Sequence, residues 1–241
     1  ILFYIKVKIM KVLAIGAHPD DIEIFMFGFL AVCKQRGDEI SLIVATDGSK
    51  GGKIKNLANI RSLETSKALS FFGKPKLLGL KDGMLGFIKD EHIKIKKEIE
   101  NIAPDLIVTH FNHDYHSDHV ALSNIVKKVA SHEIPILYCD TLMGINFSPN
   151  YFIDITDYFD LKKKAILENK SQKPKRFFAL AKLMNSYRSA QCNLPVGRFC
   201  EAYRLNSSFP FTDIRILLPS SPEILPFDIN SQKGFFINNN Y

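Results

Sequence analysis

The chain has 241 residues, of which 32 are Lys or Arg and 25 are Asp or Glu, so its formal net charge is +7. A hydrophobic fraction of 46% and a charged fraction of 24% are ordinary for a globular protein and exclude a disordered or fibrous chain. No apolar run reaches the roughly 18 residues of a membrane-spanning helix. The basic residues are scattered and accompany no nucleic-acid-binding motif, so we expect no nucleic-acid partner.

The cysteines and the two ends of the chain suggest where it works and how far its fold extends. The cysteines show no CxxC spacing, which fits a reducing cytoplasm; they are Cys33, Cys139, Cys192 and Cys200. Residues 1–9 precede Met10, lack a cleavage site and are predicted to be an upstream extension or an added β-strand rather than a signal peptide. Residues 206–241 contain four prolines and an Asn-rich end, which predict an extended tail. We expect a single domain over residues 1–241.

Apolar runs and helical periodicity alternate along the chain. Strands are predicted at 12–15, 39–45, 76–80, 105–110, 135–139 and 151–155. Helices are predicted at 22–36, 57–72, 91–102, 120–130, 157–169 and 177–188. This alternation predicts a Rossmann-like, three-layer α/β fold with a mostly parallel central sheet flanked by helices.

The first polar cluster follows the strand at 12–15 directly. The sequence KVLAIGAHPDD delivers His18, Asp20 and Asp21 to the carboxyl edge of the predicted sheet, where open α/β folds bind their ligands. Imidazole and carboxylate groups together indicate a metal site. Asp20, next to Asp21 in the chain, is predicted to be the general base that takes a proton from water.

The second cluster, HFNHDYHSDH at 110–119, also follows a strand. With His18 and Asp21, His119 would complete a set of ligands that suits a catalytic Zn²⁺ and leaves a position open for water, whose pKa falls to about 7 on the metal. Such a site also accepts Fe²⁺, Co²⁺ or Ni²⁺. His116 is predicted to stabilise the oxyanion of a tetrahedral intermediate, with Asp118 fixing its orientation.

Simpler interpretations exist for each of these features. Carboxylates after a strand are common helix N-caps, and HSDH before a helix could be a cap with a surface histidine. Arg61 and Glu64 have the spacing of an exposed helical ion pair. The loop TDGSKGG at 46–52 could cradle a phosphate but lacks the P-loop spacing, so a flexible linker is the simpler interpretation. The two clusters at two strand ends favour one joint site.

Together the motifs resemble those of the PIG-L/LmbE-like zinc-dependent N-deacetylases. The hallmark segments are AHPDD at 17–21 and HSDH at 116–119. The weaker matches are TDG at 46–48, RxxE at 61–64, LGLKDG at 78–83, KSQ at 170–172 and FCEAYRL at 199–205. The resemblance covers roughly residues 11–205.

This resemblance implies a Rossmann-like fold, zinc bound by His18, Asp21 and His119, and Asp20 as the general base. It also implies that His116 supports the oxyanion or protonates the leaving amine, and that Asp118 is its partner. Arg61 and Asp82 match positions that help to hold the sugar. The implied substrates are N-acetylated amino sugars and their conjugates.

The chain departs from the family pattern at four positions. Ser117 replaces a proline in the second motif, and Asn169 stands where a histidine often precedes SQ. Ser49 and Lys50 replace the acidic residue that often follows TDG, a change that favours an anionic ligand.

We therefore expect a zinc-dependent hydrolase that removes an acetyl group from an N-acetylated amino sugar or glycoconjugate, with the zinc-bound water attacking the amide carbonyl. The alternatives are an amidase or esterase acting on a non-sugar conjugate, and a carbohydrate-binding protein that keeps the metal site without turnover. A nucleotide-binding protein is disfavoured because no GxGxxG follows Ile15. The sequence leaves the oligomeric state open, with a homo-oligomer as one alternative.

Overall fold

A computed structural model describes residues 9–88 and 90–227 of the chain. Residues 1–8 of the predicted extension at 1–9 and residues 228–241 of the predicted tail lie outside the described residues. The strands are β1 (Lys11–Gly16), β2 (Glu39–Thr46), β3 (Lys76–Leu80), β4 (Leu106–Thr109), β5 (Ile136–Cys139), β6 (Tyr151–Asp154) and β7 (Cys200–Leu205). The α-helices are α1 (Asp21–Phe25), α2 (Phe27–Arg36), α3 (Leu57–Ala68), α4 (Glu91–Ile102), α5 (Ser117–Ala130), α6 (Phe159–Glu168) and α7 (Pro174–Gln191). Short 3₁₀ helices are η1 (Leu142–Gly144), η2 (Thr156–Tyr158), η3 (Lys170–Gln172) and η4 (Arg215–Leu217).

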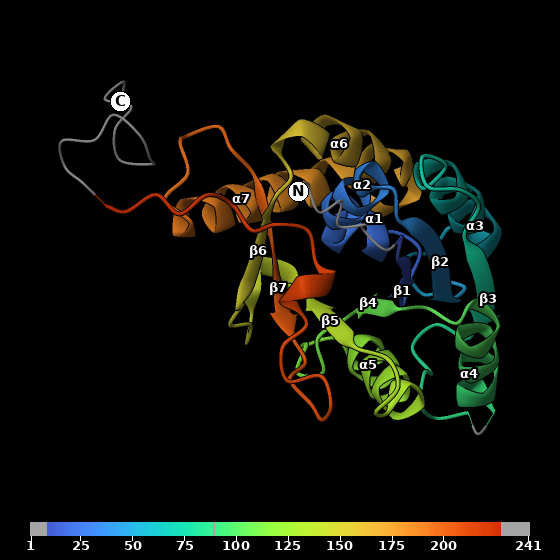
Figure 1. The fold of residues 1–241 in the computed structure, drawn as a ribbon. Coiled ribbons are helices and arrows are strands. Elements are labelled where there is room, and N and C mark those ends of the chain that lie inside the picture. The colour runs from blue at the N-terminus through green and yellow to red at the C-terminus, as the bar shows by residue number, and fades with distance from the viewer. Residues whose placement is uncertain (1–8, 89, 228–241) are drawn as a thin grey trace.

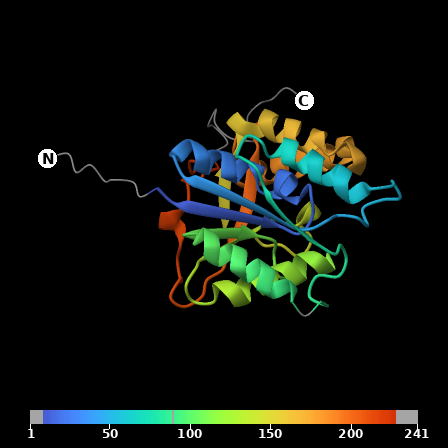
Figure 2. The same cartoon turned by 90° about the vertical axis from the view of Figure 1, so that its right-hand side faces the viewer.

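All seven strands form one sheet in the order β3-β2-β1-β4-β5-β7-β6. The first five are parallel, whereas β7 runs antiparallel to both β5 and β6. Helices α4 and α5 cover one face, and α1, α2, α3, α6 and α7 cover the other (Figure 1; Figure 2). The predicted three-layer α/β fold with a mostly parallel sheet is confirmed.

Side chains of β1 alternate between the two faces of the sheet and supply both halves of the core. Val12 and Ala14 pack beneath α1 and α2, whereas Leu13 and Ile15 pack beneath α4 and α5. All four are fully buried. Parallel strands covered on both faces have this continuous apolar character, which explains why the strand was recognisable in the sequence.

The predicted helix at 22–36 is wrong in one respect, because the structure divides it into α1 and α2 at Met26. The reason is a distant carboxylate. Glu201 of β7 accepts hydrogen bonds from the N–H groups of Gly28 and Phe29, at 2.9 and 2.7 Å, and so caps a new helix start. No local pattern could have indicated this partner.

The predicted tail is also more ordered than expected over its described part. Residues 206–227 include η4, and Ile214 and Leu218 on either side of it are buried. The Tyr151 hydroxyl donates to the carbonyl of Pro219 at 2.8 Å, and Arg36 donates to that of Leu217 at 2.9 Å. Within the described residues no helix has the length and apolar character needed to cross a membrane.

A buried ion pair connects α6 with β7. Lys162 Nζ lies 2.7 Å from Glu201 Oε1, and both side chains are almost entirely excluded from solvent. Lys162 also donates to Asn185 of α7, and Glu201 accepts from the Tyr203 hydroxyl at 2.7 Å. Removing one partner of such a pair leaves an uncompensated charge in the core, which is strongly destabilising.

We therefore expect Lys162→Met to lower the free energy of unfolding by about 3–5 kcal/mol, measured by chemical denaturation. Lys164→Met is the matched control, since Lys164 is an exposed residue of the same helix, and should change stability by no more than about 0.5 kcal/mol. Equal stability of the two variants would contradict this role for the ion pair.

Candidate metal-dependent active site

The two polar clusters meet because β1 and β4 are neighbours in the sheet. Val12 pairs with Leu106 and Ala14 with Val108, so the residues that follow both strands emerge at the same edge. After β1 the chain builds β2 and β3 on one side and then crosses back to form β4 on the other. Open α/β sheets bind ligands at such a switch point.

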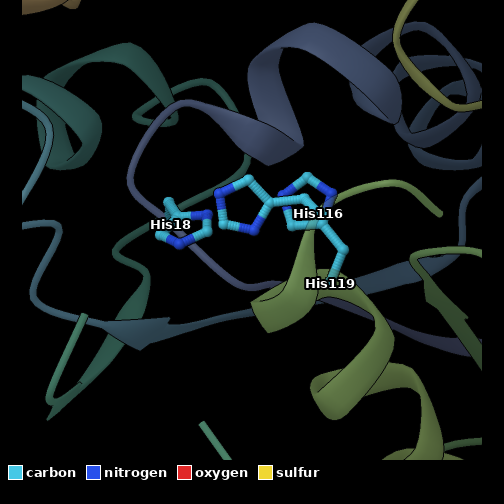
Figure 3. Close-up of side chains that lie close together, drawn as sticks. All are labelled: His18, His116 and His119. Carbon is cyan, nitrogen blue, oxygen red and sulfur yellow. The ribbon is translucent and has the colours of Figure 1, made fainter. Parts of the chain in front are cut away.

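Three imidazoles converge at this edge (Figure 3). The ring centroid of His18 lies 5.4 Å from that of His119 and 4.7 Å from that of His116, while His116 and His119 are 4.6 Å apart. Three groups in the described chain have ligand atoms close enough to share an ion: His18 with His116 and His119, Asp21 with His110 and His119, and His18 with Asp82 and Asp118.

Asp21 lies between the two histidines of the predicted ligand set. One carboxylate oxygen is 3.3 Å from His18 Nδ1, and the other is 3.4 Å from His119 Nε2. The backbone N–H of His18 donates to the Asp21 carboxylate at 2.7 Å, which fixes its direction. The structure therefore brings His18, Asp21 and His119 together.

The charges of the cluster fit a cation. Burial alone would lower the pKa of His18, but hydrogen bonds with Asp118, Asp21 and Asp82 raise it to about 12. Burial likewise lowers the pKa of His119, while Asp21 and Asp114 raise it to about 9. The surrounding carboxylates thus favour positive charge on both rings, and a divalent ion held by imidazole and carboxylate ligands would supply that charge instead.

Two residues of the second cluster that received no separate role in the sequence analysis contact this ligand set. Asp114 Oδ2 lies 3.0 Å from His119 Nδ1, and His110 Nε2 lies 3.1 Å from Asp21 Oδ2. A carboxylate on the far nitrogen of a ligating histidine orients the ring and makes it a stronger donor. The sequence signal was the density of His and Asp at 110–119, but it could not rank the individual residues.

Asp20 has a strained backbone and a buried charge partner. Its φ of 105° lies in the left-handed region that non-glycine residues rarely occupy. Burial raises the pKa of its carboxyl to about 7, although Arg61, whose Nη2 is 3.1 Å from Asp20 Oδ2, opposes the rise. The Asp20 side chain makes no capping hydrogen bond to α1, so the simple helix-cap interpretation is wrong for this residue.

Arg61 and Glu64 do not form the exposed helical ion pair that their spacing suggested. Arg61 is 3% exposed and donates to the carbonyls of Gly48 and Pro19 as well as contacting Asp20. Glu64 instead accepts hydrogen bonds from the N–H and hydroxyl of Ser171. The guanidinium therefore connects the AHPDD turn to the loop after β2.

His116 is both a helix cap and a wall of the site. Its Nδ1 accepts a hydrogen bond from the backbone N–H of Asp118 at 3.2 Å, at the start of α5. Burial and the neighbouring histidines lower its pKa, which favours the neutral ring. In a neutral ring whose Nδ1 accepts, Nε2 carries the proton and is a hydrogen-bond donor.

The Asp118 carboxylate is directed to His18 rather than to the ring of His116. Its Oδ2 lies 3.1 Å from His18 Nε2 and accepts from Gly83 N–H at 2.7 Å. Asp82 approaches the same nitrogen of His18 with Oδ1 at 3.3 Å. Asp118 therefore orients His116 through its backbone N–H, because its carboxylate contacts His18 instead.

These residues line a cavity of about 340 Å³. We call its buried lining residues His18, Asp20, Asp21, Arg61, Asp82 and His119, with half-buried His116, its inner part. The more exposed Lys50, Gly51, Tyr115, Leu142, Gln172 and Phe177 also line it. The loop at 46–52 is thus a wall of this cavity. Asn169 lies outside the lining, buried, with Nδ2 3.2 Å from Glu23 Oε1.

Comparisons with known proteins place this arrangement in a family. A family model described as "PIG-L: GlcNAc-PI de-N-acetylase" matches residues 13–130, which contain both motifs. The chain is 30% identical over 172 residues to the uncharacterised deacetylase YaiS of Escherichia coli K12, covering 66% of this chain and 90% of that protein. The chain belongs to the PIG-L family. The family predicted from AHPDD and HSDH is therefore confirmed.

Two further similarities differ in what they say about chemistry. The diacetylchitobiose deacetylase of Thermococcus kodakarensis is 26% identical over 196 residues, covering 71% of this chain and 73% of that protein. The crystal structure of GalB, a 4-carboxy-2-hydroxymuconate hydratase from Pseudomonas putida, has a TM-score of 0.72 at 16% identity and covers 90% and 100% of the two chains. The second likeness concerns the fold alone and does not identify the reaction.

The contact between Asp114 and His119 predicts a measurable effect on metal binding. Asp114→Asn should weaken the affinity for Zn²⁺ by about 10–100-fold, because His119 loses the carboxylate that orients it. Competition with a chromophoric chelator measures this affinity. Asp157→Asn, a change in η2 outside the cavity lining, is the control, and equal affinities in both variants would refute the role given to Asp114.

Proposed function

We propose that this PIG-L protein is a metal-dependent deacetylase that releases acetate from an N-acetylated amino sugar or glycoconjugate. The observation that carries the proposal is the cavity in which a His and carboxylate cluster, a buried Asp20 and a neutral His116 face one another. The names of the family model and of the diacetylchitobiose deacetylase support the choice of an N-acetylated sugar.

His18, Asp21 and His119 would hold the metal ion, with Zn²⁺ as the first choice and Fe²⁺, Co²⁺ or Ni²⁺ as alternatives. When bound, the ion supplies a Lewis acid for the acetyl carbonyl and lowers the pKa of water. Asp114 orients His119, and His110 orients Asp21, each by a hydrogen bond to that ligand.

Asp20 accepts the proton of the water that attacks the acetyl carbonyl. Arg61 positions Asp20, and the His116 Nε2–H donates a hydrogen bond to the carbonyl oxygen as negative charge develops there. The carbon–nitrogen bond then breaks, the proton passes to the leaving amine, and the products are acetate and the free amino sugar. Asp118 and Asp82 keep His18 in place from the other side of the ring.

Asp82 lines the cavity and is proposed to contact the sugar as well. Arg61 also borders the cavity, but its hydrogen bonds to the AHPDD turn and to Gly48 leave little of the guanidinium for a substrate. We also infer a single domain, since all seven strands in the described chain belong to one sheet.

Removal of the metal tests the central step of the proposal. Dialysis against a strong chelator should abolish acetate release from N-acetylglucosamine-type substrates, and stoichiometric Zn²⁺ should restore it, because attack by water at neutral pH needs the ion. Acetate is measured by a coupled enzymatic assay. Unchanged release from protein shown to be metal-free by elemental analysis would exclude this mechanism.

Substitution of Asp20 separates metal binding from catalysis. Asp20→Asn should reduce kcat by about 10²–10⁴-fold while the bound metal stays near one equivalent, because the amide cannot accept the proton. Acetate release and metal content are measured on the same preparation. Full activity of the variant would remove Asp20 from the role of base, and activity confined to non-sugar amides or esters would redirect the proposal to that substrate class.

A further inference from the structure

Two segments with many basic residues border the cavity. Lys50 and Gly51 line it from the loop after β2, and Gln172 and Phe177 line it from η3 and the start of α7. The segments lie against each other, since a Cβ atom added to Gly51 would be 2.7 Å from Gln172 Oε1. We call the basic side chains of residues 50–55 and 170–176 the cationic rim.

The cationic rim has little internal compensation. Its members are Lys50, Lys53, Lys55, Lys170, Lys173, Lys175 and Arg176, and neither segment contains Asp or Glu. All of them are exposed. Of these seven side chains, only that of Lys170 forms an ion pair within residues 9–88 and 90–227, with Nζ 4.0 Å from Glu168 Oε2. The rim therefore places positive charge beside the cavity, and Lys50 is its one member in the cavity lining.

Lys50 joins the rim to the inner cavity. A Cβ atom on Gly83 would lie 2.7 Å from Lys50 Nζ, so the ammonium group rests on the Asp82–Gly83 turn. The backbone N–H of Lys50 donates to Asp82 at 2.8 Å, and Asp82 in turn faces His18. The other cation in the cavity lining, Arg61, is engaged by Asp20 and by two carbonyl groups.

The charges of the inner cavity are paired with one another, whereas those of the rim are mostly unpaired. Asp20, Asp21 and Asp82 line the interior, and Asp118 lies directly behind His18. Arg61 and the histidines already offset these carboxylates, so the uncompensated positive charge of the site lies on the rim. An anionic group would be attracted there, which leaves the neutral acetamido end of the substrate to enter the pocket.

We propose that the cationic rim binds an anionic group, such as a phosphate, that the N-acetylated sugar carries outside the acetamido pocket, with Lys50 as the first contact. This inference rests on the proposed deacetylase function and specifies its substrate. A lysine ammonium is a compact charge suited to phosphate or carboxylate oxygens. The same chemistry would recognise a soluble sugar phosphate or a phosphate-linked lipid headgroup.

The test compares charged and neutral sugars on the zinc-loaded enzyme. The probes are N-acetylglucosamine, N-acetylglucosamine 1-phosphate and a lipid-linked N-acetylglucosaminyl phosphate in neutral vesicles. The variants are Lys50→Gln, the pair Lys173→Gln with Lys175→Gln, and the control Lys97→Gln, an exposed residue of α4 on the opposite face of the sheet. The readout is the ratio of kcat/KM for charged to neutral probe.

We expect this ratio to be about 10 in the unmodified enzyme. In Lys50→Gln it should fall about tenfold, mainly because KM for the charged probe rises. The rim pair should lower it too, Lys97→Gln should match the unmodified enzyme, and high salt should reduce the preference. Whichever of the two charged probes has the higher kcat/KM shows whether the phosphate belongs to a soluble sugar or to a lipid headgroup.

Release of acetate from all probes at a ratio that Lys50→Gln does not change would overturn the cationic rim as a binding site and leave the deacetylase function standing. A failure to release acetate from any sugar by the zinc-loaded enzyme would overturn both. These outcomes separate the two proposals.

Discussion

Parallel pairing of β1 with β4 is the constraint on which the site depends. The two strands are far apart in the sequence, but their register brings the turn after Gly16 and the loop after Thr109 to one edge. His18 and Asp21 come from the first and His119 from the second. Because both strands are buried in the middle of the sheet, the main chains that carry these groups are held by hydrogen bonds on both sides. The turn after Gly16 and the loop after Thr109 therefore both begin from fixed positions at this edge.

The electrostatic consequence of this convergence is an excess of carboxylates in a small buried volume. Asp21, Asp82, Asp114 and Asp118 all face imidazole nitrogens at 3.0–3.4 Å. Buried carboxylates are stable only when a positive charge or hydrogen-bond donors offset their loss of hydration. Protonated histidines meet that need in the free protein, and a divalent ion would replace those protons. Arg61 serves the same purpose for Asp20, which leaves this carboxylate outside the ligand set and available for proton transfer.

The sequence predicted the parts of this molecule that depend on local pattern. The apolar strands, the helix periods and the polar clusters at two strand ends were enough to indicate the fold and the meeting of His18, Asp21 and His119. The break at Met26 was not predictable, because its cause is Glu201, 173 residues from Gly28. The partner of Arg61 was hidden for the same reason, since residue spacing in a helix indicates Glu64 and only the tertiary fold brings Asp20 close. The direction of the Asp118 carboxylate depends on a hydrogen bond from the N–H of Gly83, and no periodic pattern in the sequence indicates that contact.

The position of β7 has a consequence for how the chain acquires its fold during synthesis. This strand is synthesised after the other six strands of the sheet, yet it lies between β5 and β6 rather than at an edge. Its Glu201 also supplies the hydrogen-bond acceptors for the start of α2, near the beginning of the chain. A nascent chain that stops before Cys200 would hold Lys162 without its counter-ion and α2 without its cap. The domain should therefore mature only after β7 has been synthesised, and fragments lacking β7 should be substrates for chaperones and proteases.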